Sequence, residues 1–398
     1  MGPHRGRRPH RLSHAVKRVA LYYPWIYVRS GVERVILEIV QRSRHRYTVF
    51  THHLDQAQTY PEFRDLPDVV VLGHIPVERS FRAVLRAART IAAQKLDLQG
   101  YDALLVSSEG LGDLITFRNH DQLVFCFCHT PARPLYDPVY RDTWLAAHPS
   151  ARIPLAMFSL AYRAVTRRAW RYYQRVFANS REVAGRIARG RLCPSERVEI
   201  LHPGVDVERI RPSFRYESYF LCAGRIKWTK NVGLAIEAFR EFQRSHVDRP
   251  GWRLVIAGGL DAGSREYFAE LERRSREAPG ITFQLDPTTE ELDRLYDGAT
   301  ALLFPSLNED WGIVPLEAMA FGKPVLAVNR GGPTESVVDG ETGFLLEPTA
   351  VAFAGRMRWL ADRPEEVRRL GEAASRRARQ YSWTAFVERL DDYIDSGR

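Results

Sequence analysis

The sequence has few cysteines and no long apolar run, and each shortage excludes a class of protein. Its four cysteines, Cys126, Cys128, Cys193 and Cys222, do not have the spacing of metal ligands, so neither a zinc site nor a disulfide scaffold is expected. No run of about eighteen apolar residues is present, which argues against a membrane-spanning helix. Residues 1–18 are basic but lack the apolar segment of a signal peptide. We therefore expect a cytoplasmic protein.

The composition is that of a soluble, positively charged protein with two domains. Its 398 residues are 45% hydrophobic and 27% charged, and they exceed the size of one ordinary domain. The net charge of +10 is unevenly placed: residues 1–20 hold six Arg or Lys and no acid, and residues 151–191 hold ten Arg against the single Glu182. Such charge attracts nucleotides, nucleic acid or the phosphates of a bilayer, and charge alone does not distinguish them.

Short apolar runs alternate with helical periodicity along the chain. In the first half we predict strands at 19–23, 69–72, 103–106, 123–128, 175–178 and 198–201, and helices at 32–42, 79–95 and 181–189. After Pro212 the pattern restarts, with strands at 219–223, 254–257, 281–284, 301–304, 324–328 and 343–346, and helices at 231–244, 264–276, 290–297, 315–320 and 334–338. This is the α/β pattern of two doubly wound sheets. Their ligands lie beyond the carboxyl ends of the strands, so the expected site is the cleft between the halves.

The stretch from 304 to 320 carries the most chemistry. A buried strand runs into a loop and then into a helix, with Pro315 at the expected first helical position. The backbone N–H groups around 312–316 would form a positive dipole end that suits an anion. Glu309 and Glu317 lie on either side of this point, and they suit hydroxyl groups that flank a phosphate.

A second cluster lies at 222–231, where a strand ends in Gly224 and two cations precede a helix. Arg225 offers a bidentate fork and Lys230 a compact charge, and together they suit a diphosphate leaving group. The alternative for such a pair is a solvated turn. The presence of Glu309 and Glu317 in the same half favours the diphosphate site.

Together these motifs resemble those of the retaining glycosyltransferases of family 4, which have the two-domain GT-B architecture. The resemblance rests on E-D-W-G-I-V-P-L-E at 309–317, G-R-I-K-W-T-K-N at 224–231, L-V-I-A-G-G at 254–259 and K-P-V-L-A-V-N-R-G-G-P-T-E at 323–335, with weaker matches at 31–34, 129–133, 179–180 and 202–206. The chain is most similar to bacterial mannosyltransferases that use GDP-mannose. The resemblance implies two Rossmann-like domains that face a central cleft. It divides the chain into a flexible basic arm at 1–18, an acceptor-binding domain at 19–205, a nucleotide-sugar-binding domain at 206–380, and a C-terminal helix at 381–398 that packs on the N-terminal domain.

The resemblance also implies a role for each matching residue. Arg225 and Lys230 would bind the donor diphosphate, while Glu309 would face the donor sugar and Glu317 the ribose hydroxyls. His129 would sit in the cleft near the transferred sugar. His129, Glu309, Arg225 and Lys230 would be the catalytic residues. The remaining donor-binding residues would be Gly31, Gly224, Asp310, Trp311, Gly312, Ile313, Val314 and Leu316.

The implied reaction moves a hexose to a hydroxyl acceptor, either a glycan or a lipid-linked one, with Arg133 on the acceptor side. GDP-mannose is the favoured donor and a UDP-hexose the second. The departing diphosphate would take the proton of the acceptor, and no D-x-D lies in a suitable loop, so neither a cofactor nor a metal is expected. No nucleic-acid-binding fold accompanies the charge, so nucleic acid is not expected as a partner.

Several alternatives stay open at this point. The protein could be a UDP-sugar-dependent enzyme acting on a small-molecule or natural-product acceptor, or a non-catalytic scaffold that binds a sugar nucleotide. The acceptor, the linkage and the oligomeric state are not fixed by the sequence. His129 could be a buried strand-end histidine, and Trp311 could pack in the core instead of contacting the sugar. Glu335 is expected to cap the helix that follows Pro333. Residues 151–191 form either an interfacial helix at the inner face of a membrane or a packed aromatic face with a solvated basic face.

Overall fold

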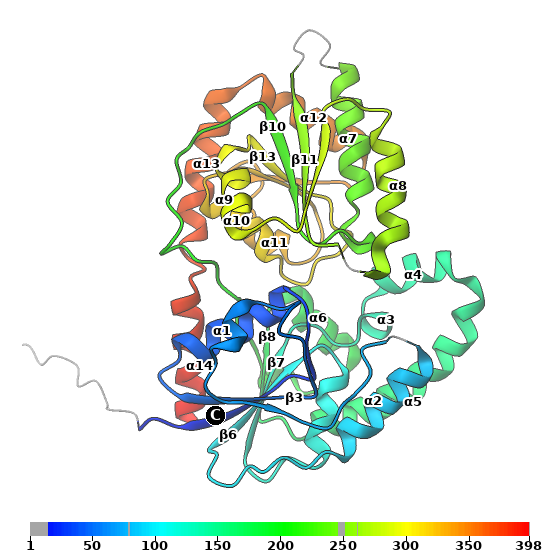
Figure 1. Ribbon diagram of the computed structural model, residues 1–398, viewed down its shortest axis with the longest axis vertical. Helices are drawn as coiled ribbons and strands as arrows, with labels where there is room; N and C mark the ends of the chain where they lie inside the picture. The colour runs from blue at the N-terminus through cyan, green and yellow to red at the C-terminus, as the bar shows by residue number, and fades with distance from the viewer. Residues whose placement is uncertain (1–14, 79, 246–250, 261, 398) are drawn as a thin grey trace, which may run out of the picture.

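The computed structural model describes residues 15–78, 80–245, 251–260 and 262–397. Two parallel β-sheets, one in each half of the chain, lie one above the other in Figure 1, with helices packed around them. Seven strands form the N-terminal sheet in the order β5-β3-β1-β6-β7-β8-β9, and six form the C-terminal sheet in the order β12-β11-β10-β13-β14-β15. This is the arrangement of two doubly wound halves that the sequence predicts.

The strands are nearly continuous apolar runs because elements cover both faces of each parallel sheet. The N-terminal strands are β1 (Arg18–Tyr22), β3 (Arg46–Thr51), β5 (Val69–Val71), β6 (Ala103–Ser108), β7 (Leu123–Cys128), β8 (Arg175–Ala178) and β9 (Val198–Ile200). The C-terminal strands are β10 (Tyr219–Ala223), β11 (Arg253–Gly258), β12 (Ile281–Leu285), β13 (Ala301–Phe304), β14 (Val325–Val328) and β15 (Gly343–Leu346). Two short strands, β2 (Trp25–Ile26) and β4 (His53–Leu54), pair with each other.

The helices follow the predicted alternation, with additional helices before β8 and after β15. Those of the N-terminal half are α1 (Gly31–Arg42), α2 (Phe81–Ala93), α3 (Arg133–Tyr136), α4 (Pro138–Ala147), α5 (Arg152–Trp170) and α6 (Arg181–Gly190). Those of the C-terminal half are α7 (Val232–Ser245), α8 (Arg265–Ser275), α9 (Thr289–Gly298), α10 (Ile313–Ala320), α11 (Pro333–Ser336), α12 (Ala350–Ala361) and α13 (Pro364–Ala378). The last helix of the chain is α14 (Trp383–Ser396). None of the helices in the described ranges has the length and apolar content needed to cross a membrane.

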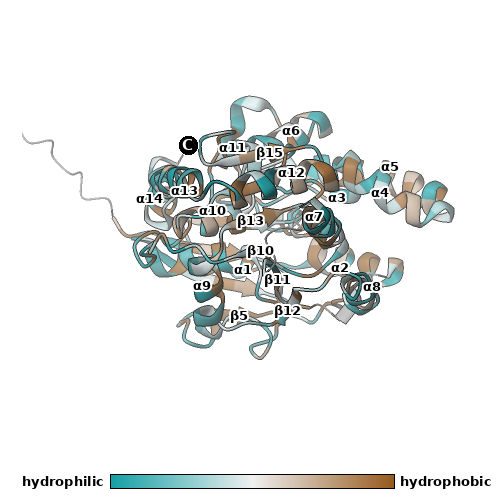
Figure 2. Ribbon diagram, turned by 90° about the horizontal axis from the view of Figure 1, so that it is seen from above, coloured by the Kyte–Doolittle hydropathy of each residue, from teal (hydrophilic) through white to brown (hydrophobic). Residues whose placement is uncertain are grey.

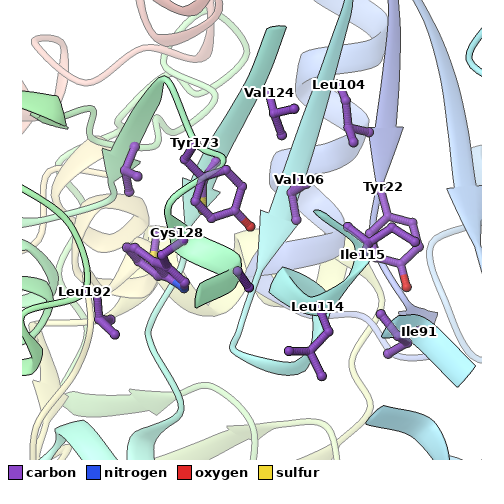
Figure 3. Close-up of a cluster of buried hydrophobic side chains, with 14 of the residues drawn as sticks. Tyr22, Ile91, Leu104, Val106, Leu114, Ile115, Val124, Cys128, Tyr173 and Leu192 are labelled. Atoms are coloured by element: carbon purple, nitrogen blue, oxygen red, sulfur yellow. The ribbon is translucent and has the colours of Figure 1, made fainter. Parts of the chain in front are cut away.

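Each half has its own hydrophobic core on both sides of its sheet. Successive residues of a strand point to opposite faces, so Ala20 and Tyr22 join one core cluster while Val19 and Leu21 join the other. Hydrophilic segments of the ribbon lie mainly on the outer helices (Figure 2). Figure 3 shows the cluster around Tyr22, in which neighbouring strands and the segments packed on them contribute Leu104, Val106, Val124, Ile91 and Ile115.

The C-terminal helix α14 crosses back and packs on the N-terminal half. Phe386 meets the ring of Phe127 edge-on at 5.4 Å, and Leu390 is buried in the same cluster. The crossing is tight at Gly204, where a Cβ atom would lie 2.4 Å from the backbone carbonyl carbon of Ser382. Only a residue without a side chain fits this close approach. The helix therefore belongs to the N-terminal body although it follows the C-terminal sheet.

The basic arm predicted at 1–18 does not extend to residue 18. Residues 1–14 lie outside the described residues, whereas Arg18 already begins β1 and its backbone N–H donates to Asp102 at 2.7 Å. The ammonium group of Lys17 donates to the carbonyl of Ile394 in α14 at 2.6 Å. The prediction that residues up to 18 form a free arm is therefore wrong for these two residues, because β-pairing and the end of α14 hold them.

Truncating the α14 contact should destabilise the whole protein. We expect Leu390→Ala to lower the free energy of unfolding by about 2–5 kcal/mol, because it leaves a cavity in a buried cluster. The exposed neighbour Arg389→Ala should change it by less than about 0.5 kcal/mol. Chemical denaturation of both variants measures the difference, and equal effects would show that α14 does not contribute to the N-terminal core.

Candidate active site

The loops that follow the strands of both sheets meet at the boundary between the two halves. A Cβ atom on Gly31, at the start of α1, would lie 3.3 Å from the side chain of Ile313 at the start of α10. The hydroxyl of Ser180, at the start of α6, donates to the backbone carbonyl of Asp310. The loop after β13 is therefore enclosed by residues from the other half of the chain, as expected for a ligand site at the carboxyl ends of parallel strands.

Lys230 and Glu309 form a salt bridge in this region. The Lys230 ammonium donates to Glu309 Oε2, and the hydroxyl of Ser306 donates to the same oxygen at 2.9 Å. Burial would raise the pKa of Glu309, but the charge and hydrogen bond of Lys230, the charge of Arg133 and the Ser306 hydroxyl lower it to about 2. Glu309 is therefore a carboxylate at all physiological pH values. The structure brings together these two residues, which lie 79 positions apart in the sequence.

Gly224 and Arg225 lie beside the same pair. They line a small pocket together with Lys230, Phe304 and Pro305. Gly224 has a φ of 126°, a left-handed conformation that favours glycine and that turns the chain sharply after β10. The pocket thus carries two cationic side chains at the end of one strand, as the diphosphate prediction requires.

The helix α10 begins earlier than predicted. Gly312 is its N-cap with a φ of 91°, and Ile313 and Val314 form its first positions, so Pro315 is the third helical residue and not the first. The first N–H groups of a helix have no acceptor within the helix. The helix end that we predict to bind an anion would therefore be formed by the backbone at Gly312, Ile313 and Val314. The side chain of Leu316 is fully buried in the core, which leaves only its backbone for a donor contact.

Two other predicted donor residues have distinct surroundings. Glu317, in the middle of α10, accepts a hydrogen bond from the hydroxyl of Tyr296 at 2.8 Å, and burial raises its pKa. Trp311 is buried, stacks on His202 at 4.2 Å, and donates its indole N–H to the carbonyl of Pro203 at 3.1 Å. The side chain of Trp311 therefore packs in the core, as the alternative interpretation has it, and its contact with a donor stays a prediction.

His129 lies at the end of β7, on the N-terminal side of the site. Its Nε2 is 2.8 Å from the hydroxyl of Ser107, and its ring meets Phe127 edge-on at 5.0 Å. Burial lowers the pKa of His129 to about 4, so the imidazole is neutral at pH 7. The interpretation as a buried strand-end histidine is thus correct for its packing, and its role toward a sugar stays a prediction.

The sequence motifs do not identify two carboxylates near this point. Glu33 in α1 is fully buried, and burial raises its pKa to about 7, with Arg225 among the charges that act on it. Glu109, which follows β6, is exposed and accepts a hydrogen bond from the hydroxyl of Tyr23 at 2.9 Å. Glu33 lies within the weakly matching segment 31–34, which implies no role for it, and the only sequence signal of Glu109 is its place after the carboxyl end of a strand.

Arg133 and Arg186 connect the two halves through the loop after β13. Arg186 in α6 is fully buried, and its guanidinium contacts Asp137 at 3.1 Å, Glu182 at 3.0 Å and Asp310. Arg133 contacts Asp137 at 3.0 Å, and it also donates to the backbone carbonyl of Asn308 in the other half. We call Arg133, Asp137, Glu182, Arg186 and Asp310 the interdomain cluster. Arg133, predicted on the acceptor side, has its guanidinium held by this cluster.

Glu335 also acts across the boundary. Its Oε1 accepts hydrogen bonds from the backbone N–H groups of Arg181 at 2.7 Å and Glu182 at 3.3 Å, the first residues of α6. His202 Nε2 lies 3.0 Å from its other oxygen. The prediction that Glu335 caps the helix after Pro333 is wrong, because that helix has four residues and the side chain reaches the helix of the other half instead.

In the described part of the chain, no three His, Cys, Asp or Glu side chains gather in a way that could hold a metal ion. The cations near the predicted diphosphate position are instead Arg225 and Lys230. The expectation that the reaction needs no metal stays a prediction.

Two family models match the chain, one in each half. The model described as Glycosyltransferase Family 4 matches residues 29–209. The model described as Glycosyl transferases group 1 matches residues 208–377. Together they extend from the start of the site at α1 to the end of α13.

Two relatives that are named as glycosyltransferases resemble the chain over different lengths. The alpha-1,3/1,6-mannosyltransferase of Neurospora crassa is 27% identical over 434 aligned positions, which span 92% of this chain and 88% of that protein. A D-inositol 3-phosphate glycosyltransferase of Streptomyces avermitilis is 32% identical over 55% of this chain and 51% of the relative.

Two solved structures share the fold. HepE from Anabaena, solved with UDP and glucose, has a TM-score of 0.72 and 16% identity over 96% of this chain and 100% of its own. Sucrose-phosphate synthase from Thermosynechococcus elongatus has a TM-score of 0.74 and 18% identity over 96% and 98%. With both halves matched by glycosyltransferase models and the whole chain sharing this architecture, the protein belongs to the GT-B glycosyltransferases of family 4.

Proposed function

We propose that the protein transfers mannose from GDP-mannose to a hydroxyl of a glycan or lipid-linked acceptor, with a UDP-hexose as the second candidate donor. The observation that carries this proposal is the Lys230–Glu309 salt bridge beside the pocket lined by Gly224 and Arg225. The relatives named alpha-1,3/1,6-mannosyltransferases support mannose as the sugar. We also propose that the protein works at the cytoplasmic face of a membrane.

The donor would lie with its diphosphate between two cationic groups and a helix end. Arg225 and Lys230 supply the side-chain charge, and the N–H groups at the start of α10 supply the dipole. Glu309 stays ionised because its pKa is about 2, so it accepts hydrogen bonds from sugar hydroxyls and holds Lys230 in place. Glu317, five residues into α10, is the candidate for the ribose hydroxyls.

The chemistry requires one bond to break and one to form on the same face of the sugar. The anomeric C1–O bond to the diphosphate breaks, and the acceptor oxygen bonds to C1. The acceptor's proton moves to the departing diphosphate oxygen, so a retaining transfer needs no side-chain base. Arg225, Lys230 and the end of α10 stabilise the charge that develops on the leaving group, which is where electrostatic catalysis is largest.

The interdomain cluster would position the loop after β13, which we call the donor loop. Glu309 and Asp310 are adjacent, and Asp310 is held by Arg186 from the N-terminal half. Closure of the two halves therefore fixes the residue next to the one that faces the sugar. Arg133 and Arg186 would therefore have a positioning role. Closure of the two halves would also exclude water from the donor.

Removing either member of the central salt bridge should abolish most of the activity. We expect Lys230→Ala and Glu309→Gln each to lower kcat by about 10²–10³, because each removes a preorganised electrostatic contact. Exposed controls, Lys95→Ala and Glu290→Gln, should keep the wild-type rate. Transfer is measured with a panel of GDP- and UDP-sugars. Wild-type protein that binds a donor without any transfer or hydrolysis would instead indicate a scaffold.

Weakening the interdomain cluster should affect catalysis more than folding. We expect Asp310→Asn to lower kcat/KM about tenfold, since the donor loop loses its charged contact to Arg186. The melting temperature should change little, because Arg186 keeps Asp137 and Glu182. Asp142→Asn, on an exposed part of α4, is the control. An unchanged kcat/KM in Asp310→Asn would contradict the positioning role.

Chelation should leave the reaction intact. We propose that Arg225 and Lys230 supply the positive charge that a divalent cation supplies in other transferases, so the rate in EDTA should stay within about twofold of the untreated rate. The measurement is transfer by protein dialysed against EDTA, with and without added Mg²⁺ or Mn²⁺. A loss of activity that either ion restores would refute this part of the proposal.

A further inference from the structure

The outward face of α5 is apolar. Ile153, Met157 and Leu160 are 74%, 71% and 78% exposed, three of the four highest values among the large hydrophobic side chains described. Their spacing of four and three residues places them on one face of the helix. The opposite face holds the buried side chains Tyr162 and Trp170. The helix therefore packs on the protein through its aromatic residues and presents a second apolar face to the solvent.

Helix α2 extends this face. Phe81 and Leu85, one turn apart, are 65% and 39% exposed. The ring of Phe81 lies 6.0 Å from that of Phe158 in α5, so the two helices meet at this point. In Figures 1 and 2, α5 and α4 project from the side of the molecule with hydrophobic as well as hydrophilic segments. We call the exposed residues Phe81, Leu85, Ile153, Met157 and Leu160 the apolar patch.

The charged side chains of the two helices that carry the apolar patch have one sign. Helices α2 and α5 contain no Asp or Glu. Arg163 and Arg167 donate to the backbone carbonyls of Leu135 and Gly190, which fixes them to the protein. The other arginines of the two helices are exposed: Arg82, Arg86, Arg89, Arg152 and Arg168. The patch thus lies on two helices whose exposed charged side chains are all cationic.

We infer that the apolar patch docks the protein on an anionic lipid bilayer. The apolar side chains would enter the boundary between headgroups and acyl chains, and the arginines would contact lipid phosphates. A second copy of the chain fits less well. In a symmetric dimer each patch meets itself, which would bring arginines against arginines with no acid on either helix to pair with them.

The apolar patch lies on a segment of the chain that also borders the candidate active site. The chain runs from His129 through α3 and α4 directly into α5. The ring of Tyr140 in α4 lies 5.0 Å from that of Trp228, close to Lys230 in the donor half. The segment that carries the patch therefore also borders the candidate active site. If the proposed function holds, docking brings a lipid-linked acceptor to the opening of that site, whereas the docking itself does not depend on it.

Vesicle sedimentation tests the inference without any substrate. Full-length protein is mixed with vesicles of phosphatidylcholine alone or of equal parts phosphatidylcholine and phosphatidylglycerol. We expect binding to the anionic vesicles only, and weaker binding as salt is raised. The double variant Met157→Glu/Leu160→Glu should bind at least about tenfold less, because charge replaces the inserting groups. Arg86→Glu/Arg168→Glu should also reduce binding, and in that variant the dependence on salt should decrease.

The matched control is Val351→Glu in α12, since Val351 is 72% exposed on the C-terminal half. It should bind vesicles as the wild type does. Melting temperatures of all variants establish that they are folded. The inference is overturned if the wild type does not bind anionic vesicles, or if Met157→Glu/Leu160→Glu binds them as well as Val351→Glu. It is also overturned if the wild type is a dimer in solution that this double variant converts to a monomer.

Discussion

The contact between Arg186 and Asp310 decides how two separate halves share one site. The loop after β13 presents adjacent carboxylates to different halves: Glu309 to Lys230 in its own half, and Asp310 to Arg186 in the other. A fully buried guanidinium is stable only with carboxylates around it. Arg186 has Asp137 and Glu182 in its own half, so the loop depends on Arg186 more than Arg186 depends on the loop. The shape of the candidate site therefore depends on how closely the two halves meet.

The sequence predicts the fold well where local pattern is enough. Parallel strands covered on both faces are continuous apolar runs, and the runs at 123–128, 175–178, 219–223, 301–304 and 343–346 have the predicted bounds in the structure. No strand is predicted at β3, where Thr48 interrupts the apolar run, and the predicted start of α10 is wrong. Pro315 indicates a helix start by its missing N–H, but Gly312, with its left-handed φ, ends the loop earlier.

The site is predictable where its residues form motifs and unpredictable where they pair across the boundary. The spacing between Glu309 and Glu317 and the position of Lys230 after a strand both indicate a charged ligand site. In the structure Lys230 and Glu309 form a salt bridge. Arg186 and Asp310 lie 124 positions apart, and nothing near Arg186 distinguishes it from the other arginines of its segment. Glu335 caps a helix that begins more than 150 positions earlier, and no helix signal in the sequence reports such a contact.

The net charge of +10 does not show where the positive charge can act. The arginines that contribute to it have different surroundings in the structure and therefore different functions. Arg186 is buried and joins the two halves through acidic partners, while Arg163 is half-buried and its guanidinium is oriented by the backbone carbonyl of Leu135. Arg168 keeps its charge in solvent at the end of an apolar helix face. A charge count treats these three alike. Their surroundings distinguish them. The charge of a buried cation is balanced by its acidic partners, whereas the charge of an exposed cation can attract a phosphate surface.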